Sequence, residues 1–152
     1  YLGAPGNPDP VIATGDLGCF DAEGYLVIEG RKKNVVITAF GRNVSPEWPE
    51  AELTAQPAIL QAAVFGEARA NCSAVLVAAD PRQPDAVLQA AVDAANCGLP
   101  DYARIGAWVR APEPFSTANG LATANGRPRR DAVWDRFAAR LEESCGAAEE
   151  FR

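Results

Sequence analysis

The sequence predicts an α+β fold, in which a small mixed sheet carries flanking helices. Short apolar runs of β type and longer runs with helical spacing are mixed along the chain, without strict βαβ alternation. The 152 residues are 48% hydrophobic and 22% charged, which is the balance of an ordinary globular chain. This length suits one domain, or one domain with an appended stub.

The first third of the chain is expected to alternate turns with short strands. Gly, Pro, Asn and Asp cluster around short runs of β-branched and aromatic residues, a pattern typical of hairpins. The polar stretch 30–34 is the clearest break in composition and is therefore the candidate domain boundary. In order, we predict a loop over residues 1–13, a tight turn over 14–18, a turn over 21–24, strands over 25–28 and 35–38, and a short hairpin turn over 40–43.

Helices and strands are expected to follow one another in the rest of the chain. Ser45 and Pro46 indicate the start of a helix, and Pro57 ends it because proline cannot continue a helix. Apolar residues recur at helical spacing in two later segments, the second of which begins with Asp131. The predicted elements are helices over residues 50–56, 85–96 and 131–145, strands over 61–65, 73–79 and 105–109, and a long polar loop over 112–130.

The composition argues against several classes of function. With 14 basic and 20 acidic residues the net charge is −6, which argues against a general nucleic-acid binder. No apolar run reaches the ~18 residues that cross a bilayer, and no signal peptide is recognised. The chain has no His, so Ser-His and Cys-His nucleophilic pairs cannot be built from it. Four widely spaced cysteines predict neither a zinc or other metal site nor disulfides, and the expected compartment is the cytoplasm.

Three stretches carry a resemblance to a known family. The first is residues 14–18 with Asp21 and 24–26, the second is 30–37 running into 41–46, and the third is 114–115 with 121–130. In order and spacing they resemble the adenylate-forming superfamily of acyl-CoA synthetases, luciferases and adenylation domains, over nearly the whole chain. In detail the sequence is most similar to long-chain fatty acyl-CoA synthetases of bacterial type.

The resemblance implies a domain division and a reaction. Residues 1–30 would be the tail of a large N-terminal adenylation domain, and residues 31–152 a mobile C-terminal domain. The whole enzyme would activate a fatty acid with ATP to an acyl-adenylate, and then transfer the acyl group to coenzyme A with release of AMP. Magnesium is expected with ATP, with its ligands outside this fragment.

The chain is interpreted as a fragment of a longer protein. It begins without Met and contains none. The family's Gly- and Ser/Thr-rich phosphate loop, its adenine-binding segment and its acyl pocket are absent from the sequence. The fragment alone is therefore expected to be inactive, and its first partner would be its own N-terminal domain.

Two residues in the first part of the chain are candidate nucleotide ligands. Asp16 follows a Gly in the predicted turn, so its carboxylate can accept charge-assisted hydrogen bonds from two ribose hydroxyls. The resemblance implies that Asp16 holds the ribose of ATP and that Arg31 contacts the nucleotide. The alternatives are an Asp that only bonds its own turn and a solvated surface Arg in a basic run.

The resemblance also assigns a hinge and a coenzyme A contact. Lys33 matches the hinge position, where one or two backbone dihedrals absorb the rotation of the C-terminal domain between half-reactions. Gly41 matches a Gly whose bare backbone faces the pantetheine tunnel, and Arg42 beside it is a candidate contact for coenzyme A phosphates. An ordinary linker Lys and a simple hairpin Gly are the alternatives.

Arg127 is a departure from the family pattern. The family has Lys after the Gly of this loop, whereas this chain has Gly126 followed by Arg127. In the family that cation bridges the substrate carboxylate and the α-phosphate during adenylation, where it stabilises developing charge. Arg keeps the charge but is longer, planar and bidentate. Arg127 is the candidate catalytic residue, and the alternative is a solvated basic end of the loop.

Two further functions stay open. Related adenylating enzymes pass the acyl group to a carrier protein instead of coenzyme A, or stop at the adenylate. The exchange of Lys for Arg can also mark a family member that only binds an acyl-adenylate and does not catalyse.

Overall fold

The computed structural model describes residues 14–31, 35–39, 41–66 and 69–149. Contacts between residues divide the chain into two compact units, 1–34 and 35–152, which are described separately. The boundary predicted between residues 30 and 31 lies four residues before this division. The role of each unit in a whole protein stays a prediction.

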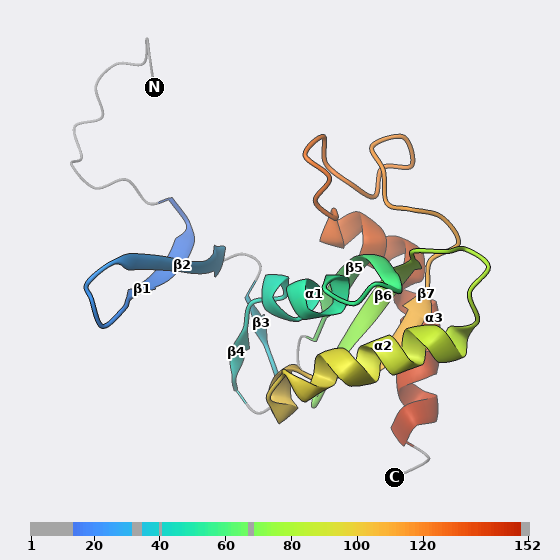
Figure 1. The fold of residues 1–152 in the computed structure, drawn as a ribbon, viewed down its shortest axis with the longest axis horizontal. Helices are drawn as coiled ribbons and strands as arrows, with labels where there is room; N and C mark the ends of the chain where they lie inside the picture. The colour runs from blue at the N-terminus through green and yellow to red at the C-terminus, as the bar shows by residue number, and fades with distance from the viewer. Residues whose placement is uncertain (1–13, 32–34, 40, 67–68, 150–152) are drawn as a thin grey trace. The chain divides into compact units, whose positions relative to one another are not determined.

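The first unit contains one antiparallel hairpin. Strands β1 (Asp16–Phe20) and β2 (Leu26–Arg31) pair with each other, as the blue ribbon of Figure 1 shows. The turn predicted over residues 21–24 is confirmed, because Asp21 Oδ1 accepts the Tyr25 N–H at 2.8 Å and the Glu23 N–H at 3.1 Å.

The tight turn predicted over residues 14–18 is wrong. Gly15 has a positive φ of 76°, but Asp16, Leu17 and Gly18 already belong to β1. Their backbone partners come from β2, at least ten residues away along the chain, and a local turn pattern cannot reveal that pairing. Gly18 is needed for it, because a Cβ there would lie 2.6 Å from the Val27 carbonyl oxygen.

The second unit is built on a mixed sheet of three strands. The strands are β5 (Ile59–Phe65), β6 (Cys72–Ala78) and β7 (Ile105–Arg110), in the order β5-β6-β7. β5 pairs antiparallel and β7 parallel with the central β6. The predicted α+β class with a small mixed sheet is confirmed.

Helices cover both faces of this sheet (Figure 1). On one face, α1 (Glu47–Thr54) and α2 (Asp85–Cys97) pack on the even-numbered residues of β6, such as Leu76. On the other face, α3 (Arg130–Glu149) packs on odd-numbered residues such as Val75. All seven residues of β6 are therefore buried. Burial also raises the pKa of the Cys72 thiol to about 11.

Most predicted elements are confirmed within one to four residues of their bounds. The clearest difference is α1, which begins three residues before the predicted start at residue 50. Pro49 is the third residue of this helix, in the first turn, where a missing N–H removes no intrahelical bond. A short 3-10 helix over Asp101–Ala103 precedes β7 and was not predicted. The expected hairpin after residue 34 consists of β3 (Val36–Ile37) and β4 (Asn43–Val44).

Candidate functional site

The two predicted nucleotide ligands lie opposite each other in the first hairpin. Asp16 and Arg31 are register partners, at the first residue of β1 and the last of β2. Directly opposed residues are the nearest cross-strand neighbours of an antiparallel pair. Asp16 is exposed, and its backbone N–H donates to Thr14 Oγ1 at 3.3 Å. The side chain of Arg31 and the whole of Lys33 lie outside the described residues.

The Gly41 turn is closed by a buried threonine. The Gly41 N–H donates to the Thr38 carbonyl at 2.9 Å, and the Thr38 N–H donates to the Arg42 carbonyl at 3.0 Å. The Arg42 N–H completes the turn by donating to Thr38 Oγ1 at 3.2 Å. Gly41 has a φ of 69°, and a Cβ built on it would meet no atom within 4 Å. The turn thus needs glycine for its backbone conformation, and its outer side faces open space.

A polar cleft lies beside Arg42. The guanidinium carbon of Arg42 is 5.9 Å from the centre of the Tyr102 ring, which is cation–π geometry. The cleft has a volume of about 660 Å³. Its polar lining residues are Arg42, Asn71, Asn96, Asp101, Tyr102 and Arg104.

The floor of this cleft is held by Asn96. Its Nδ2 donates to the Ile105 carbonyl at 2.9 Å, and its Oδ1 accepts the Ile105 N–H at 2.8 Å. Arg104 forms an ion pair with Asp101 at 2.6 Å and leaves part of its side chain exposed. An aromatic ring, the Arg42 guanidinium and amide side chains suit a ligand that carries phosphates, while the Asp101 carboxylate is paired with Arg104. Sequence reasoning missed every lining residue except Arg42, because the others follow it by 28 to 64 positions along the chain.

Arg127 is exposed and lies opposite Thr123, in the pair that closes a narrow turn whose tip is formed by residues 124–125. The Thr123 N–H donates to the Arg127 carbonyl at 2.9 Å, and the Gly126 N–H donates to the Thr123 carbonyl at 2.9 Å. The Arg127 N–H donates to Thr123 Oγ1 at 3.2 Å. An isolated β-bridge between Ala122 and Pro128 closes the base of the turn. The arrangement presents a fixed positive charge outward from the second unit.

A cluster of acidic and basic side chains lies at the base of the same loop. Arg130 donates to Glu50 Oε2 at 2.7 Å and to Glu47 Oε1 at 3.2 Å. Only 20% of the Arg130 side chain and 12% of the Glu50 side chain are exposed. Burial raises the pKa of Glu50 above its ordinary value, and outweighs the lowering by the Arg130 charge and by the Val64 hydrogen bond. No sequence pattern indicated this group, since 80 residues separate Glu50 from Arg130.

The stability that Glu50 contributes is expected to fall as the pH rises. Its pKa in the folded chain lies above the ordinary 4.5, so between these two values only the folded chain holds the proton. The contribution is complete below pH 4.5 and is lost as the pH rises through the folded pKa. Denaturant unfolding of the wild type and Glu50→Gln should show the advantage of the wild type shrinking over this window.

The matched control for this measurement is Glu113→Gln. Glu113 forms an exposed ion pair with Arg136 at 3.4 Å, so the same change of charge there should leave the pH dependence close to that of the wild type. A difference between wild type and Glu50→Gln that stays constant from about pH 4 to about pH 8 would contradict the expected shift.

No helix in the described part of the chain is long and apolar enough to cross a membrane. Among the same residues, no three His, Cys, Asp or Glu side chains are grouped so that they could hold a metal ion.

Comparison with known proteins identifies related sequences and folds. A family model described as AMP-binding enzyme C-terminal domain matches residues 33–149. The chain is 33% identical over 158 aligned residues to the long-chain-fatty-acid–CoA ligase FadD15 of Mycobacterium tuberculosis, an alignment that covers 88% of this chain and 26% of the ligase. It is 42% identical over 75 residues to the long-chain-fatty-acid–CoA ligase ACSBG1 of Bos taurus, covering 49% of this chain and 10% of that protein.

Solved structures with the same fold include two adenylating proteins. The A domain of carboxylic acid reductase from Segniliparus rugosus, in complex with AMP and a carboxylic acid, has a TM-score of 0.76 and 27% identity, with 86% of this chain and 22% of that one covered. The anthranilate CoA ligase AuaEII, in complex with anthranoyl-AMP, has a TM-score of 0.65 and 27% identity, with 87% and 24% covered. The chain therefore spans about a quarter or less of the length of these relatives.

Proposed function

The chain belongs to the family of AMP-binding enzyme C-terminal domains, and on that premise we propose that it is the C-terminal part of a long-chain fatty-acid–CoA ligase. The observation that carries the proposal is the alignment of 88% of the chain, at 33% identity, with a ligase of that name. The whole enzyme uses ATP, coenzyme A and a fatty acid, with magnesium bound by residues outside this chain. The cytoplasm is the proposed compartment.

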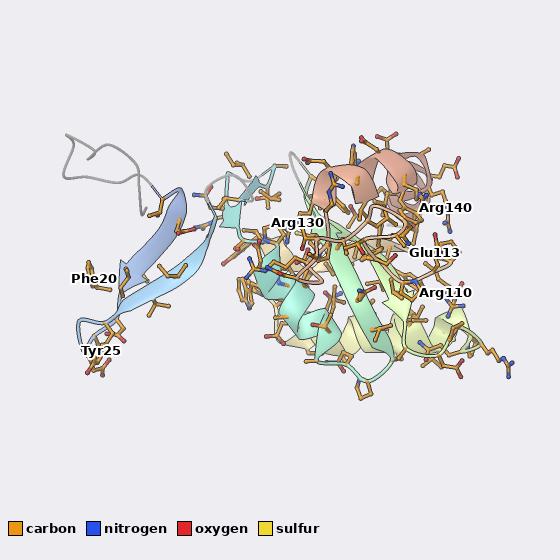
Figure 2. All side chains as sticks on the ribbon, turned by 90° about the horizontal axis from the view of Figure 1, so that it is seen from above. Phe20, Tyr25, Arg110, Glu113, Arg130 and Arg140 are labelled. Atoms are coloured by element: carbon orange, nitrogen blue, oxygen red, sulfur yellow. The ribbon has the colours of Figure 1, made fainter. Side chains whose placement is uncertain are left out.

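The two units take different roles in this proposal. Residues 1–30 end the large N-terminal domain, residues 31–152 form the mobile domain, and Lys33 is the hinge between them. The first hairpin supports this division, because it exposes 75% of Phe20 and 72% of Tyr25 (both labelled in Figure 2) together with 58% of Ile28. A two-stranded hairpin with such apolar exposure is marginally stable alone, and the rest of the N-terminal domain would cover it.

The first half-reaction joins the fatty acid to AMP. A carboxylate oxygen attacks the α-phosphorus of ATP, and pyrophosphate leaves with the electrons of the broken bond. In our proposal Asp16 and Arg31 hold the nucleotide, and Arg127 lies against the carboxylate and the α-phosphate. Its cation stabilises the charge that grows on the phosphoryl oxygens. The exposed position of Arg127, in a turn whose backbone is fixed by Thr123, supports this role.

The second half-reaction replaces AMP with a thiol. The sulfur of coenzyme A attacks the acyl carbon, and AMP leaves. In our proposal Gly41 lies beside the pantetheine arm, and Arg42 contacts the coenzyme A phosphates. Two observations support this assignment, namely the open space above Gly41 and the polar cleft next to Arg42.

A carrier protein is the second candidate acceptor. One observation favours it: the A-PCP didomain of the carboxylic acid reductase from Segniliparus rugosus, in complex with AMP, has a TM-score of 0.73 to this chain at 27% identity. In a carrier-protein enzyme the same Gly41 turn would face a pantetheine arm attached to protein. Assays of the full-length parent enzyme with coenzyme A and with a carrier protein separate the two acceptors.

Substituting Gly41 tests the proposal and separates the two half-reactions. In the parent enzyme, Gly41→Leu is expected to lower acyl transfer by about 100-fold, because a side chain fills the space of the pantetheine arm and forces a residue with a Cβ into positive φ. ATP–pyrophosphate exchange should stay within about three-fold of the wild type, because adenylation precedes thiol binding. The 152-residue chain alone should show neither activity.

Gly24→Leu is the matched control for backbone strain. Gly24 has a φ of 86°, and a Cβ there also meets no atom within 4 Å, but it lies in the turn of the first hairpin. Gly24→Leu should therefore leave both half-reactions near their wild-type rates. Equal losses in both half-reactions for Gly41→Leu would remove the assignment of this turn to the thiol step. A wild-type parent that produces no adenylate with any carboxylic acid would overturn the ligase proposal itself.

A further inference from the structure

We propose that Arg130 is a positioning residue that holds the Arg127 loop and the Gly41 turn in one rigid block. The proposal rests on the proposed function, because it concerns the two segments that would act in the two half-reactions. It is carried by a chain of hydrogen bonds from the end of β4 to the start of α3. Arg130 lies at the centre of that chain and is labelled in Figure 2.

Arg130 is tightly connected to the loop that carries Arg127. It is the first residue of α3 and follows Arg127 by three positions. The Arg129 N–H between them donates to the Leu121 carbonyl at 2.8 Å, next to the bridge from Ala122 to Pro128. Leu121 and Ala122 are buried. A displacement of Arg130 therefore moves the base of the turn and, with it, the tip.

Glu50 fixes Arg130 to the sheet. One of its carboxylate oxygens accepts from Arg130 at 2.7 Å, and the other accepts the Val64 N–H of β5 at 2.9 Å. Charge-assisted hydrogen bonds between two largely buried side chains allow little movement. The base of the Arg127 loop is thus held at a fixed place on β5.

Glu47 extends the same chain of bonds to the hairpin of Gly41. It accepts from Arg130 at 3.2 Å with Oε1, and from the Ser45 hydroxyl at 2.7 Å with Oε2. Ser45 directly follows the buried Val44 of β4, and β4 is the second strand of that hairpin. One guanidinium group consequently connects the segments of both half-reactions.

The other end of the Arg127 loop is anchored on the same strand. Gln61 of β5 donates to the Phe115 carbonyl at 3.1 Å and accepts the Phe115 N–H at 2.7 Å. Asn119 then holds the start of the loop by accepting the Ser116 N–H at 3.0 Å. With both ends fixed on β5, the tip can keep its position while the domain rotates as a body.

Arg130→Gln is expected to loosen both segments at once. In the 152-residue chain, NMR order parameters of the backbone amides at residues 123–127 and 41–44 should fall, while those of β6 stay constant. In the parent enzyme, kcat of ATP–pyrophosphate exchange and of thioester formation should each fall by about 10-fold to 100-fold, with the KM for ATP within about two-fold. Arg130→Lys keeps one charged contact and should recover part of both rates.

Two further variants separate positioning from general stability. Arg136→Gln removes another Arg of α3 that pairs with a carboxylate, Glu113, and it should change neither the order parameters nor the rates. If Arg130→Gln does not fold, Glu47→Gln replaces it, because Glu47 is more exposed. Glu47→Gln removes one of the two carboxylate oxygens that join Arg130 to Ser45, while Glu50 still holds Arg130, so residues 41–44 should loosen more than residues 123–127.

The outcomes distinguish the two proposals. If Arg130→Gln and Glu47→Gln give the same order parameters as Arg136→Gln, Arg130 does not position these segments, whatever the enzyme does. If the order parameters change as expected but the wild-type parent forms no adenylate, the ligase proposal fails and the rigid block remains. If the order parameters change while both half-reactions keep wild-type rates, positioning for catalysis is overturned.

Discussion

Replacing Arg127 with alanine in the full-length parent enzyme is expected to lower ATP–pyrophosphate exchange by about 100-fold to 1,000-fold, the usual loss when one stabilising donor is removed. Arg127 is exposed and closes its turn with Thr123 through backbone atoms of Arg127 alone, so truncation of the side chain removes the charge without disturbing the turn. Isotope exchange between pyrophosphate and ATP measures this step without the thiol acceptor. Arg82→Ala is the control, since Arg82 is an exposed Arg between β6 and α2 whose backbone N–H bonds Asp80.

The substitution Arg127→Lys tests whether Arg127 serves adenylation or marks a family member that does not catalyse. Lys restores the residue that the family pattern has at this position, so it should retain or raise exchange. Full exchange in Arg127→Ala would mean that another cation serves adenylation. A wild-type enzyme without exchange that gains it in Arg127→Lys would instead identify a family member that binds an acyl-adenylate and does not catalyse.

Leu76→Ala is expected to lower the free energy of unfolding of the second unit by about 3 kcal/mol. Leu76 is fully buried in the central strand, on the face of the sheet that helices α1 and α2 cover. Truncation leaves a cavity that the fixed backbone of β6 cannot close, because its neighbours β5 and β7 are paired on both sides. The midpoint of denaturant unfolding measures the loss, provided that its slope is unchanged.

Leu60→Ala is the matched control for this change. Leu60 lies on β5 but has 53% of its surface exposed, so its truncation should change the free energy of unfolding by less than about 0.5 kcal/mol. Trp48, Trp108 and Trp134 all lie after residue 34, and tryptophan fluorescence therefore reports on the second unit. Equal losses for Leu60→Ala and Leu76→Ala would show that Leu76 is not packed in the core as described.

Much of the fold was predictable because most of its elements have a recognisable local sequence pattern. The helical spacing of five apolar residues predicted α2, and four of them form its buried face, whereas Val87 is 42% exposed. The five are Val87, Leu88, Ala91, Val92 and Ala95. The strand β1 was missed because its partners lie in β2, and a Gly-rich segment without them has the pattern of a turn. The start of α1 was predicted three residues too late, although Pro49 lies in the first turn, where a helix tolerates proline.

The residues of the candidate site were likewise predictable only where a local pattern contains them. Gly41 and Arg127 could be singled out because each belongs to a short local pattern within a known family. The contact of Arg42 with Tyr102 and the bond of Arg130 to Glu50 join residues that are 60 and 80 positions apart. Such pairs have no periodicity and no fixed spacing, so they become visible only when the sheet brings their elements together.

The bond between Glu50 and the Val64 amide has a consequence for solubility as well. β5 is an outer strand of the described sheet, and the backbone of an outer strand is a template on which a second molecule can add. The Glu50 carboxylate, itself paired with Arg130, occupies the Val64 amide of that strand, so this amide is not open to an incoming chain. The contact is therefore expected to disfavour edge-to-edge pairing at this point of β5.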